Sequence, residues 1–346
     1  MLPRGLINTG DSQQKTAAFQ ATKKADSRTG QHSNTMQRMS SEHTPLWHFW
    51  QPRYWPLWIG LGLLRVIVLL PHKARMRLGA WLGKLTYIVA GSRANVAHKN
   101  IELCFPELTA EQQNALTRRH FESLGKTAIE MGMGWWAPDE DLNKLFVVEG
   151  EEHLDEVLRR DRGVILLCGH FPAVEISGRA MSGKMPPMAA MYRPNKNPLL
   201  GEFMRRSRSE SISELISKDS VRQLLRALKN GTPVWYAPDQ AYAGKGAILA
   251  DFCGVPAMCN PATTQLLKTS KASLLPFLPS RLPDDSGYKI LFLPPMDELP
   301  GEDPQTDTQA INDVFTGHIR RNPEQYYWVH RRFKGRPEPF TNPYDD

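Results

Sequence analysis

The run GVILLCGHFPAVE contains His170 and ends at Glu175, and in it an apolar stretch leads into a turn. Pro172 suits the first turn of a helix. Glu175 would then lie in that turn, where its carboxylate can fold back towards the imidazole and meets the positive end of the helix dipole. A neutral imidazole that takes a proton, held by a carboxylate that fixes its tautomer, is what acyl transfer to a hydroxyl requires. The alternative is a structural histidine at a strand end.

A second group of polar residues closes the run PVWYAPDQ. Asp239 and Gln240 end this run, and Lys245 follows between two glycines in a loop that can approach a ligand closely. Loops of this kind suit phosphate or carbonyl recognition. We expect these three residues to bind substrate rather than to catalyse, although Asp239 could instead cap a turn.

Two arginine-rich segments, FMRRSRSE and HRRFKGR, supply further binding candidates. Arg205 lies in the first, and Arg331 and Arg332 lie in the second. Arginine forks bind phosphates in a bidentate way, so these residues could grip a phosphorylated substrate or an acidic carrier. The alternative is an ordinary solvated surface.

Alternating strands and helices must position these groups. From Leu145 onward, short β-rich runs alternate with helix-period stretches such as DSVRQLLRALKNG. The segment before Leu145 shows a helical period broken at Pro106, which indicates two or three helices. The alternation predicts an α/β domain with a mostly parallel or mixed central sheet. Ligand groups in such sheets gather at the carboxyl ends of the strands, which is where His170 would lie.

The amino-terminal part differs in composition. Residues 1–44 are rich in Gln, Ser, Thr and Lys, which predicts a disordered leader. Residues 45–72 combine four tryptophans with an apolar run, and basic residues follow, which is typical of a membrane anchor. A spanning helix, an interfacial helix and a buried core helix are all compatible with this length. We expect the catalytic domain over residues 73–337 and a carboxyl-terminal tail over residues 338–346.

Charge and cysteine content limit the classes of binding partner and metal site that the chain could have. Lys and Arg outnumber Asp and Glu by 43 to 36, which favours anionic partners such as lipid headgroups or an acidic carrier protein. Nucleic-acid binding has no support beyond charge, because no recognised binding motif is present. The four cysteines form no C-x-x-C pair, which argues against a zinc site. The sequence implies no metal and no bound organic cofactor.

Several blocks of the chain together resemble a known family. GHFPAVE is similar to the His-x4-Asp/Glu signature of the lysophospholipid acyltransferase superfamily, in the form found in lipid A late acyltransferases. Four other blocks look like that family in the same order: RANVAHKNIELCFPEL, MYRPNKNPLL, VWYAPDQAYAGKGAILADFCGVPA and PEQYYWVHRRFKGRP. The resemblance covers about Trp47 to Pro337 and is closer to the lauroyltransferase branch than to the myristoyltransferase branch.

The resemblance implies roles for individual residues. His170 would be the general base, Glu175 its orienting partner, and Arg193 the cation that faces the developing oxyanion. It also implies an αβα glycerolipid-acyltransferase-like domain preceded by a hydrophobic membrane helix.

The resemblance further implies that an acyl group, laurate in our first hypothesis, passes from acyl-carrier protein to a hydroxyl of an acyl chain on a lipid A precursor. This would occur at the cytoplasmic face of the bacterial inner membrane. One alternative is acylation of a lysophospholipid or another glycolipid by the same chemistry. An alternative of another class is a basic, membrane-tethered binding protein.

Overall fold

The computed structural model describes residues 44–192, 195–208, 212–217 and 219–345. The predicted leader, apart from Thr44, lies outside the described residues, and so does Arg193.

A seven-stranded sheet forms the centre of the molecule, in the order β1-β9-β8-β2-β5-β3-β4. All neighbouring pairs are parallel except β8 with β9, so the predicted α/β class with a mostly parallel sheet is confirmed. A separate antiparallel hairpin, β6 with β7, was not predicted, and neither was β4. The strands are β1 (Phe146–Glu149), β2 (Val164–Leu167), β3 (Met188–Tyr192), β4 (Ile212–Ser217), β5 (Val234–Tyr236), β6 (Ile248–Phe252), β7 (Val255–Cys259), β8 (Ser273–Arg281) and β9 (Tyr288–Phe292).

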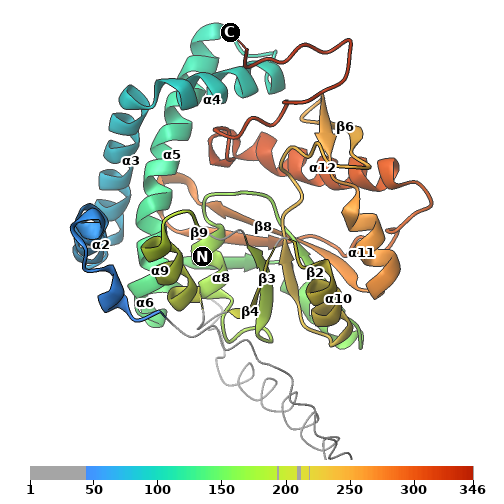
Figure 1. Cartoon of the computed structure of the whole chain (residues 1–346), viewed down its shortest axis with the longest axis horizontal. Coiled ribbons are helices and arrows are strands. Elements are labelled where there is room, and N and C mark those ends of the chain that lie inside the picture. Colours follow the sequence, from blue (N-terminus) through green and yellow to red (C-terminus); the bar gives the residue numbers. More distant parts are fainter. Residues whose placement is uncertain (1–43, 193–194, 209–211, 218, 346) are drawn as a thin grey trace, which may run out of the picture.

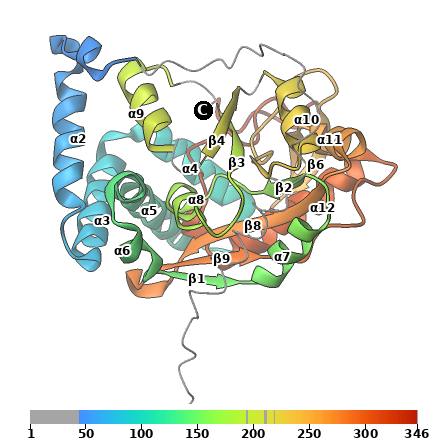
Figure 2. The same ribbon diagram turned by 90° about the horizontal axis from the view of Figure 1, so that it is seen from below.

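Helices cover both faces of this sheet. Figure 2 shows α5 and α8 on one side and α7, α10 and α11 on the other, which gives three layers. The α-helices are α2 (Trp55–Ile67), α3 (His72–Val89), α4 (Gly91–Cys104), α5 (Ala110–Trp136), α6 (Asp139–Asn143), α7 (Glu151–Arg159), α8 (Val174–Ala180), α9 (Pro198–Arg208), α10 (Val221–Lys229), α11 (Ala262–Ser270) and α12 (Pro304–Arg321). The predicted helical break at Pro106 separates α4 from α5, and α5 begins at a capping box in which Thr109 and Gln112 satisfy each other's backbone amides.

The long helices α3 and α5 pack closely along one side of the molecule (Figure 1). Glycines make this possible, since a Cβ on Gly83 would lie 2.1 Å from the backbone oxygen of Phe121. A Cβ on Gly125 would lie at the same distance from the backbone oxygen of Gly79. Because the backbones of α3 and α5 are in direct contact at these points, one side of α3 is fixed against α5 and the opposite side faces outward.

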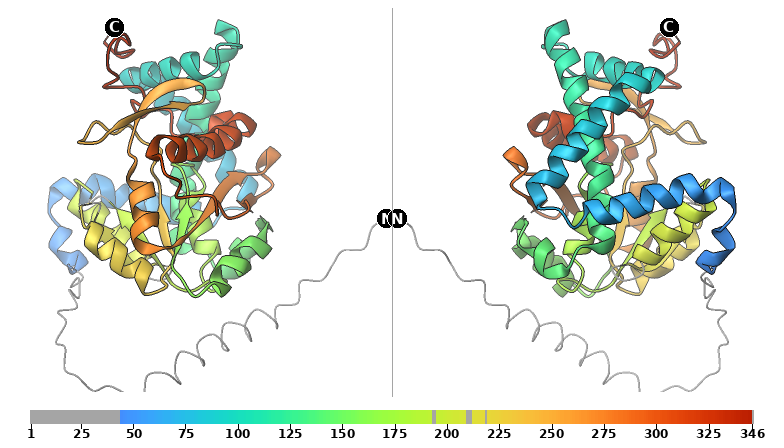
Figure 3. Two further views of the ribbon diagram at one scale, coloured as in Figure 1. Left: turned by 90° about the vertical axis from the view of Figure 1, so that its right-hand side faces the viewer. Right: turned by 90° about the vertical axis from the view of Figure 1, so that its left-hand side faces the viewer.

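Two helices expose an unusual amount of apolar surface. Figure 3 shows α2 lying along the outside of the molecule together with α3. Exposed apolar side chains gather on these helices and on the segment before them, and we call this set the apolar face: Trp47, Trp50, Trp55, Ile59, Leu63, Val66, Leu69, Trp81, Leu85, Ile88 and Val89. Within the part of the chain that the structure describes, no helix has both the length and the apolar character needed to cross a membrane. The spanning form of the predicted anchor over residues 45–72 is therefore not found, and α2 there has 13 residues.

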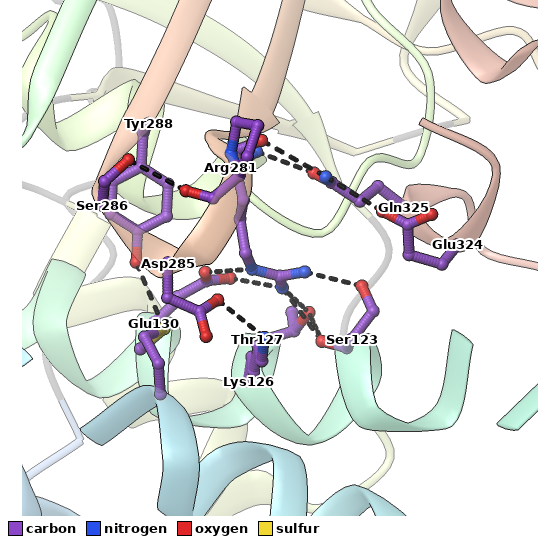
Figure 4. A network of polar contacts seen from close by, with 12 residues as sticks. Ser123, Lys126, Thr127, Glu130, Arg281, Asp285, Ser286, Tyr288, Glu324 and Gln325 are labelled. Carbon is purple, nitrogen blue, oxygen red and sulfur yellow. Dashed lines mark hydrogen bonds and ion pairs between the residues drawn. The ribbon is translucent and has the colours of Figure 1, made fainter. Parts of the chain in front are cut away.

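A buried ion pair joins α5 to the sheet (Figure 4). The guanidinium of Arg281, near the end of β8, donates to both carboxylate oxygens of Glu130 at 2.5 and 2.8 Å. It also donates to the hydroxyl of Ser123 at 2.6 Å and to that of Thr127 at 2.9 Å. Since Arg281 and Glu130 are both buried, their charges depend on each other and on these hydroxyls for compensation. The network fixes α5 against β8.

Candidate active site

His170 lies at the carboxyl edge of the sheet, as predicted. It follows β2 by three residues, and Asp239 follows β5 by three residues. The two strands pair in parallel, with Leu167 opposite Tyr236, so the segments that leave them run side by side. The amide of Cys168 continues the pairing by donating to the carbonyl of Tyr236 at 3.0 Å. This register brings His170 and Asp239 together.

Two hydrogen bonds connect these residues. The ring nitrogen Nδ1 of His170 lies 2.7 Å from Oδ1 of Asp239, and the backbone amide of His170 donates to Oδ2 at 2.8 Å. The side chain of Asp239 is fully buried, whereas that of His170 is 35% exposed. With Nδ1 bound to the carboxylate, the proton of a neutral ring belongs on Nδ1, and Nε2 is left as the acceptor. A Cβ on Gly169 would lie 2.9 Å from Cε2 of the buried Phe171 ring, so a larger residue here would have to displace that ring.

Each partner changes the pKa of the other. Burial lowers the pKa of His170, but the charge and hydrogen bond of Asp239 more than offset this, so the pKa lies above its ordinary value. Burial raises the pKa of Asp239, but the charge and hydrogen bonds of His170 outweigh that effect, and the pKa lies below its ordinary value. Asp239 is therefore an ionised carboxylate at neutral pH, well placed to stabilise an imidazolium.

Residues near the carboxyl terminus hold the Asp239 segment. The hydroxyl of Tyr326 donates to the backbone oxygen of Asp239 at 3.3 Å. The ring of His330 accepts a hydrogen bond from the amide of Ala241 through Nε2 at 3.2 Å. Burial lowers the pKa of His330 to about 4, so at neutral pH the ring is uncharged and can accept. The contact of His330 with the loop after β5 is not predicted from the sequence.

Glu175 does not take the position that we predicted for it. It lies in the first turn of α8, as expected, but its carboxylate receives two hydrogen bonds from Arg208 of α9 at 2.9 and 2.7 Å. The group that contacts the imidazole is Asp239. The physical reason is the strand register, which presents Asp239 directly to Nδ1, while α8 turns Glu175 towards α9.

The remaining predicted binding residues are dispersed. Gln240 is half-buried beside Asp239, and Lys245 is exposed in the loop between β5 and β6. Arg205 pairs with Glu202 of its own helix at 2.8 Å.

The second arginine segment divides into one exposed and one buried residue. Arg331 is exposed, with its guanidinium 5.7 Å from the centre of the Tyr344 ring. Arg332 is buried, donates to the backbone oxygen of Met258 at 3.0 Å and to the sulfur of Cys259 at 2.9 Å, and lies over Phe252. The predicted surface cluster of Arg331 and Arg332 is thus not formed, because Arg332 points inward and fastens the β6–β7 hairpin.

The described residues offer no arrangement of three or more His, Cys, Asp or Glu side chains suited to a metal ion. All four cysteines are buried and free. The contact between His170 and the buried carboxylate of Asp239 suits proton transfer through Nε2 of the ring. Aromatic side chains lie next to this pair: the ring centres of Trp235 and Tyr327 are 6.5 and 6.4 Å from that of His170.

Comparisons with known proteins agree with the sequence resemblance. A family model described as bacterial lipid A biosynthesis acyltransferase matches residues 43–335. A lipid A biosynthesis lauroyltransferase of Escherichia coli (strain K12) is 38% identical, with 83% of this chain and 94% of that protein covered. A palmitoleoyltransferase of the same strain is 39% identical, with 84% and 94% covered. The myristoyltransferase of that strain is 27% identical, with 88% and 95% covered.

Proposed function

We propose that this chain, which belongs to the bacterial lipid A biosynthesis acyltransferase family and is an acyltransferase, uses His170 as its general base and Asp239 as the carboxylate that orients it. The observation that carries this proposal is the 2.7 Å contact between Nδ1 of His170 and the buried carboxylate of Asp239. Nε2 of His170 takes the proton of the acceptor hydroxyl, and the hydroxyl oxygen attacks the carbonyl carbon of the acyl thioester. The tetrahedral intermediate collapses to an ester, and the proton passes to the departing thiolate.

Two further residues have proposed roles. The family resemblance assigns the developing oxyanion to Arg193, and we retain that role as a proposal for a residue outside the described ones. A fixed cation of this kind contributes about 3 to 4 kcal/mol to a transition state. For Glu175, we propose that it acts by holding the guanidinium of Arg208.

The proposed donor is an acyl-carrier protein, and the proposed acceptor is a hydroxyl of an acyl chain on a lipid A precursor. Laurate is the proposed acyl group, supported by the 38% identity with the lauroyltransferase. The equally similar palmitoleoyltransferase makes palmitoleate the natural competitor. Competition between lauroyl and palmitoleoyl carrier protein at equal concentration tests this choice, and preferential transfer of palmitoleate would reject laurate.

The acceptor is tested separately. Wild-type protein is given a lipid A precursor or lysophosphatidic acid with the same donor, and products are measured by mass spectrometry. We expect acylation of the lipid A precursor. Acylation of lysophosphatidic acid alone would establish the lysophospholipid alternative, and binding of both lipids without turnover would favour the membrane-tethered binding protein.

We further propose that the apolar face lies on the cytoplasmic surface of the bacterial inner membrane rather than spanning it. Tryptophans are favoured at the membrane interface, and exposed Arg53, Arg65, Lys73 and Arg77 lie near the face, where they can meet anionic headgroups. Ile59 and Leu63 are 64% and 61% exposed, so this surface is uncovered in the isolated chain. Contiguous apolar surface of this kind indicates an interaction site.

A vesicle assay tests this attachment. Replacing Ile59 and Leu63 by serine removes about 2 to 4 kcal/mol of apolar transfer energy, which weakens partitioning about 30- to 1,000-fold. The matched control replaces Val147 and Val221 by serine. These two valines are 48% and 50% exposed and lie outside the apolar face. Vesicles of phosphatidylethanolamine and phosphatidylglycerol should sediment the wild type and the control but not the variant. Equal sedimentation of all three would reject the face as the attachment site.

A further inference from the structure

The exposed side of α10 carries a row of positive charges. Arg222, Arg226 and Lys229 are exposed at positions i, i+4 and i+7, which align on one side of a helix, while Leu224 and Leu228 are buried on the other. The helix VRQLLRALK contains no acidic residue. Like charges at i and i+4 destabilise a helix. Because α10 has no acidic residue, no carboxylate of this helix offsets the repulsion between these cations.

The neighbouring helix extends the positive surface. α11 packs beside α10, exposes Lys268 in its last turn and is followed by exposed Lys271. The ammonium of Lys268 lies 3.4 Å from the backbone oxygen of Glu302. No ion pair between these five cations and a carboxylate is recorded among the described residues. We call Arg222, Arg226, Lys229, Lys268 and Lys271 the basic surface.

The basic surface begins at the edge of the sheet where the active site lies. β4 and β2 run in the same direction through the parallel pairs β4–β3, β3–β5 and β5–β2. The end of β4 at Ser217 is therefore at the same edge as the end of β2, which leads to His170. Because α10 starts shortly after β4, Arg222 lies at that edge and Lys229 at the opposite one. Lys268 and Lys271 lie with Lys229, because they come just before β8, which starts at the same edge as β2.

The basic surface is on the side of the molecule away from the apolar face. Figures 1 and 2 both show α10 and α11 on one flank and α2 and α3 on the other. A bilayer that contacts the apolar face therefore does not reach the basic surface. The anionic partner must come from solution, and half-exposed Val221 beside Arg222 offers it an apolar contact as well.

We infer that the basic surface is the docking site for an acidic, soluble protein, namely the carrier that delivers the acyl thioester. This inference rests on the proposed function, since it locates the proposed donor on the chain. Complementary charge speeds encounter and sets the orientation of the complex. A carrier docked along α10 would reach the active-site edge at Arg222, where the thioester arm could enter towards His170 while the lipid acceptor approaches from the membrane side.

Charge reversal tests the docking site with the full-length protein in detergent. The test variant is Arg222→Glu/Arg226→Glu. The matched control is Arg118→Glu/Arg119→Glu, which changes the net charge equally at two exposed arginines of α5. Binding of fluorescently labelled lauroyl-carrier protein is measured by anisotropy at low and high salt. Turnover is measured with that donor and with lauroyl-pantetheine, a neutral thioester without the protein.

We expect the test variant to bind the carrier about tenfold more weakly at low salt, with less dependence on salt, while the control binds as the wild type does. Turnover with lauroyl-pantetheine should be the same in all three proteins. Wild-type binding by the test variant, or equal weakening in the control, would overturn the docking site. Carrier binding that is weakened by the reversal, with no transfer from either donor, would support the docking site and reject the proposed reaction.

Discussion

Replacement of Asp239 by asparagine tests which of two carboxylates, that of Asp239 or that of Glu175, supports His170. At the observed 2.7 Å, attraction between an imidazolium and a carboxylate is on the order of 6 kcal/mol at an effective dielectric constant of 20. The ring is 35% exposed, so solvent screening reduces this to about 4 to 5 kcal/mol. Loss of that stabilisation, together with the wrong ring tautomer, should lower kcat about 10³- to 10⁴-fold.

The pH dependence of kcat/KM identifies the residue responsible. A general base must be neutral, so the rate rises with pH through the pKa of His170, which Asp239 holds above its ordinary value. Asp239→Asn removes the charge that raises this pKa, so the inflection should move to lower pH. Glu175→Gln should leave the inflection in place, because the Glu175 carboxylate contacts Arg208. An inflection that shifts in Glu175→Gln and stays in Asp239→Asn would refute our assignment.

Three other changes have expected outcomes. Glu130→Ala leaves the buried charge of Arg281 unpaired and should lower the free energy of unfolding by about 3 to 5 kcal/mol in urea titrations; a loss below 1 kcal/mol would contradict this. Burial lowers the pKa of His120 and His318 from 6.5 to about 4, so the unfolded chain binds more protons between these values. The free energy of unfolding should therefore fall by about 1.4 kcal/mol per pH unit for each histidine as the pH drops from 6.5 to 4, and a urea midpoint constant over that range would contradict it. His330→Ala removes the acceptor for an amide beside Asp239 and should lower kcat about tenfold without changing the thermal unfolding temperature, whereas an unchanged kcat would argue against positioning.

The sequence predicted the position of His170 well because its signals are local. The apolar run before it is β2, and Glu175 falls in the first turn of the following helix. The run PVWYAPDQ likewise contains β5 of the central sheet. β4 was missed because ISELIS mixes polar and apolar residues and is only partly buried.

The partner of His170 was not predicted, because it depends on strand pairing. Asp239 was recognised as polar at a strand end, but its approach to the imidazole follows from β2 lying beside β5 in a sheet whose order is far from the chain order. The equal spacing of His170 after Leu167 and of Asp239 after Tyr236 was a usable signal once those strands are paired. Arg332 was expected to bind substrate at the surface, but it is buried. A run of arginines in a sequence does not reveal which of them turns into the core.

We propose that His170 activates a hydroxyl of a lipid A precursor for acyl transfer. The most direct measurement compares wild-type and His170→Ala membranes supplied with lauroyl-carrier protein and a tetra-acylated lipid A precursor, with protein amounts matched and the thermal unfolding of both proteins recorded. We expect the precursor to gain the mass of one acyl chain in the wild type, and the folded variant to be slower by at least about 10³-fold. Transfer by folded His170→Ala at the wild-type rate would show that His170 is not the general base.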